Sequence, residues 1–215
     1  MRNIYVTTLY NLPVSGCTGE TGVYDLYKKA FEISLKRVYK FNSELFDEYI
    51  VLVNNESAQN NGDMDYNIIK KLYSIWSQGD VNVLYSEVDT ICHGDLSDVF
   101  KFDKMMMFAK GTAPDPEEYN SGVLYFPASM PQNVWDTIMS MHSDWKTYWA
   151  YFQKIFDTAY KMHGPVSENR RFNAFWGPVE SPLITHHFSS RGIHNLLEVY
   201  KEYDSSDPLP SFREL

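Results

Sequence analysis

Residues 81–91 read Val-Asn-Val-Leu-Tyr-Ser-Glu-Val-Asp-Thr-Ile and join an apolar run to two closely spaced carboxylates. The run over residues 81–85 is short and mostly apolar, which predicts a buried strand. Side chains at positions i and i+2 of an extended chain share a face, so Glu87 and Asp89 are expected to point the same way. Two carboxylates this close repel each other unless a cation lies between them. Oxygen ligands of this kind favour hard ions such as Mg²⁺ or Mn²⁺.

Strands and helices alternate on both sides of this stretch. Strands are expected over residues 3–10, 49–53, 81–85 and 119–126. Helices are expected over residues 23–39 and 65–77, near 95–100, within 131–156 and over about 193–203. The alternation predicts an α/β fold, a Rossmann-like and mostly parallel central sheet flanked by helices, in a single domain.

Composition narrows the classes of protein that remain. The 215 residues are 44% hydrophobic, as in folded globular chains, and the net charge of −9 disfavours general binding to nucleic acid. Cys17 and Cys92 are too few for a disulfide framework, which is typical of a reducing compartment. No stretch approaches the roughly 18 apolar residues that a membrane span needs. The sequence therefore predicts a cytoplasmic protein without a membrane span.

Three motifs together resemble those of nucleotide-sugar glycosyltransferases with the GT-A fold, in particular the glycogenin-like, retaining group. Residues 85–91 followed by Gly-Asp-Leu at 94–96 are similar to that group's metal-binding segment. Tyr-Asn-Ser-Gly-Val-Leu at 119–124 looks like its Asn-x-Gly strand, and Thr-His-His-Phe at 185–188 looks like its late metal-binding histidine. The motifs occur in the family's order.

The resemblance implies a set of metal ligands. Asp89 and His187 would bind Mn²⁺ or Mg²⁺, with Glu87 in the place of the family's first aspartate. His187 is preferred to His186 because Phe188 follows it, and His186 is the alternative. Glu87 has one methylene more than aspartate, so it would reach the metal directly, reach it through a water or contact the ribose instead.

The resemblance also implies contacts to the donor. The end of the first expected strand would hold the base and ribose, with Tyr10 stacking on the base, and Asn120 would hydrogen-bond a sugar hydroxyl. Arg191 would contact the diphosphate in place of the family's lysine. The residues expected to act in transfer are Asp89, Asn120 and Arg191, and those expected to contact the donor are Thr7, Thr8, Leu9, Tyr10, Glu87, Val88, Asp89, Asn120, Ser121 and Arg191.

These expectations combine into a metal-dependent hexosyl- or pentosyltransferase that uses a nucleotide-diphosphate sugar, expected to be a uridine one. The acceptor would be a glycan, a protein or a small molecule. Residues 1–203 would form the transferase domain, with residues 1–100 as the nucleotide-binding half and 101–203 as the acceptor half. Residues 204–215 would form a loosely packed tail.

Other interpretations of the same residues stay open. Glu87 as a solvated loop residue and Asp89 as a turn or helix cap need no metal. An inverting mechanism would use a base such as Asp136 or Asp144. A non-catalytic nucleotide-sugar-binding module would keep the sheet and lose turnover. A sugar transferase acting on nucleic acid bases would need a local basic groove, built from residues such as Lys161, Arg170 and Arg171.

Overall fold

Three parallel strands form the centre of the structure, a computed structural model of the 215-residue chain. Strand β1 (Arg2–Tyr10) lies between β2 (Glu48–Asn54) and β3 (Val81–Ser86). Every residue of β3 is buried, which explains its nearly continuous apolar run. The structure describes residues 1–10, 23–54, 61–110, 117–145, 151–165, 168–174, 179–187 and 207–215.

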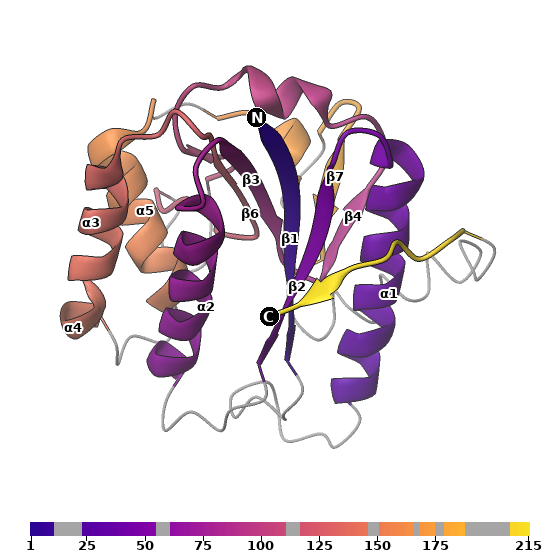
Figure 1. Ribbon diagram of the computed structural model, residues 1–215, viewed down its shortest axis with the longest axis horizontal. Coiled ribbons are helices and arrows are strands. Elements are labelled where there is room, and N and C mark those ends of the chain that lie inside the picture. Colours follow the sequence, from indigo (N-terminus) through magenta and orange to yellow (C-terminus); the bar gives the residue numbers. More distant parts are fainter. Residues whose placement is uncertain are drawn as a thin grey trace.

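Two crossover helices lie on opposite faces of this sheet. Helix α1 (Val23–Asn42) connects β1 to β2, and α2 (Asn61–Trp76) connects β2 to β3 on the far side of β1. Because both crossovers are expected to be right-handed and they run in opposite directions, the helices must cover opposite faces. Figure 1 shows α1 on one side of the sheet and α2 on the other. The carboxyl ends beside β1 therefore form a switch point, where α/β proteins bind ligands.

The sheet continues with antiparallel strands on one edge. Strand β6 (Val123–Phe126) pairs with β3, and β5 (Met106–Met107) pairs with β6. A two-residue strand, β8 (Arg213–Glu214), pairs in parallel with β2 on the other edge, giving the order β5-β6-β3-β1-β2-β8. This mixed sheet confirms the predicted α/β class, a mostly parallel sheet flanked by helices.

A second, two-stranded sheet stands apart from the main one. Strand β4 (Thr90–Cys92) pairs antiparallel with β7 (Ile184–His186), two segments that are more than 90 residues apart in the sequence. This pairing was not predicted from the sequence, because each strand has only three residues.

The remaining helices pack mainly on the face that α2 covers (Figure 1). They are α3 (Gln132–Ser140), α4 (His142–Trp145) and α5 (Tyr151–His163). Two 3-10 turns lie elsewhere: η1 (Ser97–Lys101), whose Phe100 packs on Phe46, and η2 (Arg170–Phe172), which contacts β7. Aromatic rings fill the space between these helices and the sheet: Phe126 lies 4.9 Å from Trp135 and 5.6 Å from Phe156 between ring centroids. Trp135 is thus a core residue.

Some expected boundaries differ from the structure. The strand expected over 119–126 begins only at Val123, because residues 121–122 form a turn. The stretch 131–156, expected to contain one or two helices, contains α3, α4 and the start of α5, which continues to His163. The helix expected over about 193–203 lies outside the described residues. In the tail expected to pack loosely, the backbone of Leu215 bonds to both Val51 and Val53 and Pro210 is buried, while the other described tail residues are exposed or half-buried. The expected domain bounds stay predictions.

Candidate metal centre

The chain turns sharply where β3 ends, and hydroxyl groups hold the turn. The backbone N–H of Thr90 donates to the carbonyl of Glu87 at 3.3 Å, and the Thr90 hydroxyl donates to the same carbonyl at 2.8 Å. The Thr90 hydroxyl also lies 3.1 Å from the Ser86 hydroxyl, which in turn bonds Tyr5 of β1. The turn fixes Glu87 and Asp89 at the carboxyl end of β3.

The small sheet brings a histidine to this turn. In the β4–β7 pairing Thr90 lies opposite His186, and the backbone N–H of His187 donates to the carbonyl of Asp89 at 2.8 Å. A histidine nearly one hundred residues later in the sequence is therefore held beside the acidic pair by backbone hydrogen bonds, which do not depend on the side chains.

Three side chains converge here. Nε2 of His186 lies 3.2 Å from Oδ1 of Asp89 and 3.4 Å from Oε2 of Glu87. Ligand atoms of these residues all fall within 4.8 Å of one another. The His186 side chain is 1% exposed and that of Asp89 10%, whereas that of Glu87 is 33% exposed. The cluster therefore has a buried base and one open side, formed by Glu87.

The structure places His186, rather than the expected His187, against the carboxylates. Successive side chains of a strand point to opposite faces, so only one of the two histidines can face the turn. Nε2 of His187 lies instead 3.1 Å from the hydroxyl of Thr185, a residue that also bonds His93. The choice of His187 rested on Phe188 as a neighbour, and a neighbour in sequence does not determine which face a side chain takes.

The electrostatics of the cluster favour a positive charge. Burial of the His186 ring opposes its protonation, but the carboxylates of Asp89 and Glu87 outweigh burial and raise its pKa to about 10. Oδ1 of Asp89 is buried, and among the described residues it has no partner other than Nε2 of His186, 3.2 Å away. Two carboxylates and an imidazole nitrogen also form a donor set that divalent cations bind. The residues present therefore fit a cation.

Gly122 leaves room for the His186 ring. A Cβ atom added at Gly122 would overlap Cε1 and Nδ1 of that ring and would lie 2.8 Å from Oδ1 of Asn120. The carbonyl of Gly122 accepts a hydrogen bond from the backbone of Glu87 at 2.9 Å. The Asn-x-Gly segment thus packs directly against the acidic turn and the histidine.

The expected nucleotide-contacting residues of β1 lie beside the cluster. Thr7 pairs with Ser86 in the register between β1 and β3, so the end of β1 is adjacent to the acidic turn. Thr7 and Thr8 are buried, Leu9 is half-buried, and Tyr10 pairs with Asn54 through the backbone. Contacts of these residues with a nucleotide stay predictions.

The other expected residues differ in what the structure does with them. Val88 and Ser121 are buried, and Asn120 directs its amide oxygen toward His186 at 3.1 Å from Nδ1. Arg191 lies outside the described residues. A contact of Asn120 with a donor sugar stays a prediction.

Asp65 is a candidate that the sequence analysis missed. Burial raises the pKa of Asp65 to about 7, the negative charge of Glu87 adds to this, and the backbone N–H of Phe152 donates to the carboxylate. A buried carboxyl group near another acid is typical of functional sites, although capping the start of α5 is a structural use of the same group. Asp65 stands 22 residues before Glu87, on the helix expected from residue 65, and only the packing of α2 brings the two together.

The expected alternative bases are exposed. Asp136 accepts a hydrogen bond from Gln132 on α3 at 3.0 Å, and Asp144 accepts one from Ser143 on α4 at 3.2 Å. A catalytic role for either aspartate stays a prediction.

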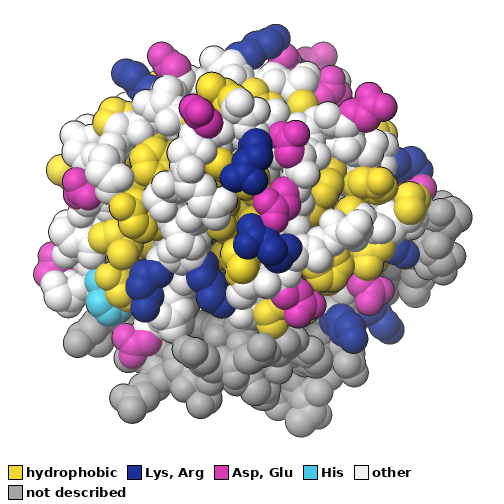
Figure 2. Space-filling view, in the orientation of Figure 1, with side chains coloured by type: hydrophobic (Ala, Val, Ile, Leu, Met, Phe, Trp, Pro, Cys, Tyr) yellow, Lys and Arg dark blue, Asp and Glu magenta, His cyan; other side chains and the backbone are white. Residues whose placement is uncertain are grey.

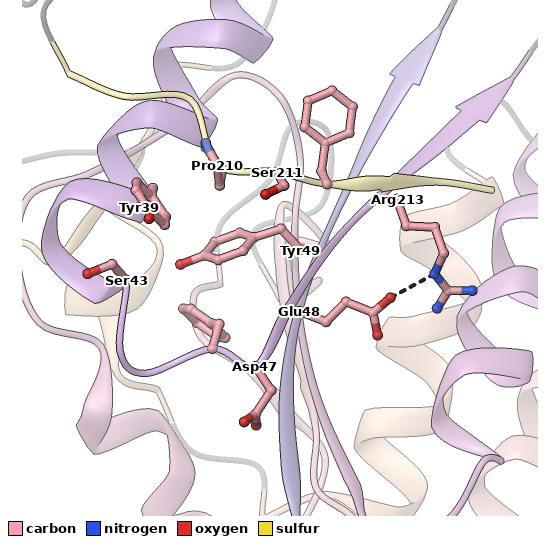
Figure 3. A pocket seen from close by; sticks show the side chains of 10 residues that line it. Tyr39, Ser43, Asp47, Glu48, Tyr49, Pro210, Ser211 and Arg213 are labelled. Atoms are coloured by element: carbon pink, nitrogen blue, oxygen red, sulfur yellow. Dashed lines mark hydrogen bonds and ion pairs between the residues drawn. The ribbon is translucent and has the colours of Figure 1, made fainter.

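A hollow of about 410 Å³ lies at the other end of the sheet, beside the amino end of β2. Figure 3 shows its aromatic walls and the bond from Arg213 of the tail to Glu48, 2.7 Å long. Tyr49 donates its hydroxyl to the carbonyl of Asn42, and Asp47 accepts the backbone N–H of Asn3 at 2.7 Å. These polar groups already form hydrogen bonds within the protein. The hollow is therefore a gap in the packing between the tail and the loop before β2.

Charges of both signs are interspersed over the face shown in Figure 2, with no broad basic patch among the described residues on it. Lys161, one residue of the alternative basic groove, pairs with Asp157 at 2.9 Å, and Arg171 donates to the carbonyl of Ser181. Two of the groove's three cations therefore serve contacts within the protein. None of the described helices combines the length and the apolar character that a membrane span requires.

Comparisons with known proteins rest on structure alone. No family model matches the sequence, and no curated protein matches it significantly. The galactosyltransferase LgtC, solved in complex with donor and acceptor sugar analogues, aligns with a TM-score of 0.57 at 14% identity, over 93% of this chain and 95% of LgtC. A glycosyltransferase involved in glycosylation of the major capsid of PBCV-1 aligns with a TM-score of 0.59 at 13% identity, over 91% of this chain and 98% of that one. The chain has the fold of a GT-A glycosyltransferase.

A third solved structure agrees with this GT-A fold. The glycosyltransferase GlyE of Streptococcus pneumoniae aligns with a TM-score of 0.56 at 15% identity, over 88% of this chain but only 55% of GlyE. At such identities the likeness concerns the fold. The resemblance drawn from three short motifs is thereby confirmed at that level.

Proposed function

We propose that this chain is a glycosyltransferase that moves a sugar from a nucleotide-diphosphate donor, a uridine one being the expected donor, to a glycan, protein or small-molecule acceptor. The observation that carries the proposal is the convergence of Glu87, Asp89 and His186 at the carboxyl end of β3, beside the switch point of the sheet. The structural neighbours are glycosyltransferases, which supports sugar transfer as the reaction class.

A divalent cation, Mn²⁺ or Mg²⁺, would be held by Asp89 and His186, with Glu87 as the third ligand or as a group that orients a ligand water. Bound there, the cation supplies Lewis-acid stabilisation of the charge that grows on the leaving diphosphate. The burial of the three side chains suits these different roles. Asp89 and His186 form the buried base, and the more exposed Glu87 faces the side from which a diphosphate approaches.

Three groups of the protein itself would prepare this site. The Glu87–Thr90 turn holds the two acids through hydrogen bonds to the backbone, so little reorganisation is needed when a ligand arrives. The β1 end, with Thr7 and Thr8, forms the adjacent wall where the nucleoside would lie. Arg191 is proposed as the cation that contacts the diphosphate.

The test uses the whole chain and two matched variants, His186→Gln and His187→Gln. Mn²⁺ binding is measured by isothermal titration calorimetry, and a panel of nucleotide sugars is screened for transfer and for slow donor hydrolysis. His186→Gln is expected to lose Mn²⁺ binding and turnover, while His187→Gln keeps both.

The possible outcomes separate the competing interpretations. If His187→Gln alone loses the metal, the ligand set from the family resemblance is right and the one proposed here is wrong. If a nucleotide sugar binds without transfer or hydrolysis, the chain is a binding module. If wild-type protein binds neither Mn²⁺ nor any nucleotide sugar, the proposed function is wrong.

A further inference from the structure

The amide oxygen of Asn120 is the meeting point of three N–H groups. It accepts hydrogen bonds from the backbone nitrogen of Gly122 at 2.8 Å and from Nδ2 of Asn173 at 2.9 Å. Nδ1 of His186 lies 3.1 Å from the same oxygen. The Asn120 and Asn173 side chains are both buried, so these bonds form away from solvent.

This geometry fixes the orientation of the amide group. A backbone N–H only donates, so the Asn120 atom that faces Gly122 must be the oxygen. An amide oxygen only accepts, so Nδ1 of His186 must carry the hydrogen of the bond that joins them. The backbone of Gly122 therefore determines, through Asn120, where the proton of the neutral His186 ring lies.

The other ring nitrogen faces the acids. With the hydrogen on Nδ1, neutral His186 presents a lone pair at Nε2, the atom that lies 3.2 Å from Asp89 and 3.4 Å from Glu87. Ionised carboxylates also present only lone pairs. The three groups then face one another as acceptors, and a cation between them satisfies all three.

The far end of the Asn120 amide is anchored as well. Its Nδ2 donates to Gln153 of α5 at 3.3 Å, and Gln153 donates to the buried carboxylate of Glu118 at 2.8 Å. The charge of Glu118 is balanced by Lys154, whose Nζ lies 3.2 Å from Oε1 of Glu118. The chain of contacts prevents the amide from flipping to offer its nitrogen to His186.

We propose that Asn120 is a positioning residue that holds His186 as the tautomer with hydrogen on Nδ1, so that Nε2 is the cation-binding atom. This inference rests on the proposed function and adds a role for Asn120 that differs from its expected contact with a sugar. Partners of a ligand histidine commonly change metal affinity by 10–100-fold when they are removed.

The test compares Asn120→Ala and Asn120→Asp with Asn82→Ala, measuring Mn²⁺ affinity by calorimetry. Asn82 is a matched control because it is equally buried and also accepts a backbone N–H, that of Ala128, at the opposite end of β3. Asn120→Ala is expected to bind Mn²⁺ about 10–100-fold more weakly. Asn120→Asp, which still offers an accepting oxygen, is expected to restore most of the Mn²⁺ affinity. Asn82→Ala is expected to lower the melting temperature and to leave the Mn²⁺ affinity unchanged.

A spectroscopic measurement checks the tautomer directly. Long-range ¹H–¹⁵N correlation spectra of the Mg²⁺-loaded protein are expected to show the His186 proton on Nδ1 in the wild type and in Asn120→Asp, but a mixture of tautomers in Asn120→Ala.

Four results would overturn the inference. A proton on Nε2 in the loaded wild type, or equal Mn²⁺ affinity of wild type and folded Asn120→Ala, overturns it while leaving the proposed function intact. Absence of Mn²⁺ binding by the wild type overturns both. A melting-temperature loss in Asn120→Ala that Asn120→Asp repairs without restoring Mn²⁺ affinity shows that Asn120 is only structural.

Discussion

Charged side chains lie at both ends of the central sheet, but the contacts of their acids differ between the two ends. At the amino end of β2, Glu48 pairs with Arg213 at 2.7 Å, and Asp47 accepts a backbone N–H. At the carboxyl end of β3, Glu87 and Asp89 face each other across an imidazole nitrogen. Acids at the first end are neutralised by the fold, and acids at the second end are held together without a cationic partner from a lysine or arginine among the described residues.

The difference separates acids that the fold itself neutralises from acids whose arrangement suits a ligand. Ion pairs on the surface contribute little and need no ligand. Buried acceptors that face only acceptors cost free energy unless a proton or a metal joins them, and such an arrangement is kept where a ligand is bound. The hollow at the amino end is therefore the weaker candidate, although it has a volume of about 410 Å³.

The largest effect is expected from Asp89→Asn. The amide keeps the shape of the side chain but removes a charge from the buried base of the cluster, so Mn²⁺ affinity should fall by more than about 100-fold, beyond the loss typical of a ligand's partner. Asp47→Asn at the amino end is the control and should bind Mn²⁺ as the wild type does. Calorimetric titration of both variants measures the contrast. Equal losses of Mn²⁺ affinity in Asp89→Asn and Asp47→Asn would mean that the cluster at the carboxyl end is not the Mn²⁺ site.

Gly122→Ala should have the next largest effect. The added methyl overlaps the His186 ring, which is buried and cannot move away freely, so a destabilisation of about 1–3 kcal/mol is expected together with weaker Mn²⁺ binding. Gly94→Ala is the control, because its Cβ would meet only the tip of Leu183 at 3.2 Å. Urea denaturation and Mn²⁺ titration of both proteins measure the two effects. Wild-type affinity in Gly122→Ala would contradict the close packing described here.

The comparison of the two ends also shows how far the sequence predicts this structure. The three central parallel strands and their crossover helices were predicted with errors of a few residues, because each is long enough to carry its own hydrophobic pattern. The acidic pair was found for the same reason: it directly follows the clearest strand. The local hydrophobic pattern is enough to predict a strand or helix that is long enough to bury one of its faces.

Tertiary contacts decide what the sequence left open. The β4 and β7 strands have three residues each, so neither has a period to detect, and their register decides which of two adjacent histidines faces the acids. Asp65 reaches Glu87 only through the packing of α2, and the tail becomes a strand only because β2 offers a free edge. Each miss involves residues far apart in the sequence.

A smaller effect is expected from His93, which lies next to the small sheet. Burial lowers the pKa of His93 to about 4, and the positive charges of Arg37 and His187 add to this. Unfolded His93 takes up a proton near its ordinary value of 6.5, so the wild type should lose stability as the pH falls from 6.5 toward 4, by an amount on the order of 2 kcal/mol.

Urea denaturation of wild type and His93→Gln between pH 7.5 and 4 isolates this contribution, since other titrating groups are common to both. The variant should lose less stability over that window. Parallel curves for the two proteins would show that His93 titrates alike in the folded and unfolded states.

The smallest effect is expected at the amino end, from Glu48→Gln. Glu48 pairs with Arg213 and lies 3.8 Å from Arg2, but both arginine side chains are nearly half exposed, so the change should cost no more than about 1 kcal/mol and should shrink further at high salt. Urea denaturation at two salt concentrations measures it, and Mn²⁺ affinity should not change. Strand β8 should stay in place, because Leu215 bonds to β2 through its backbone. A loss well above 1 kcal/mol would show that the tail depends on this ion pair, and that charges at the amino end also carry part of the fold.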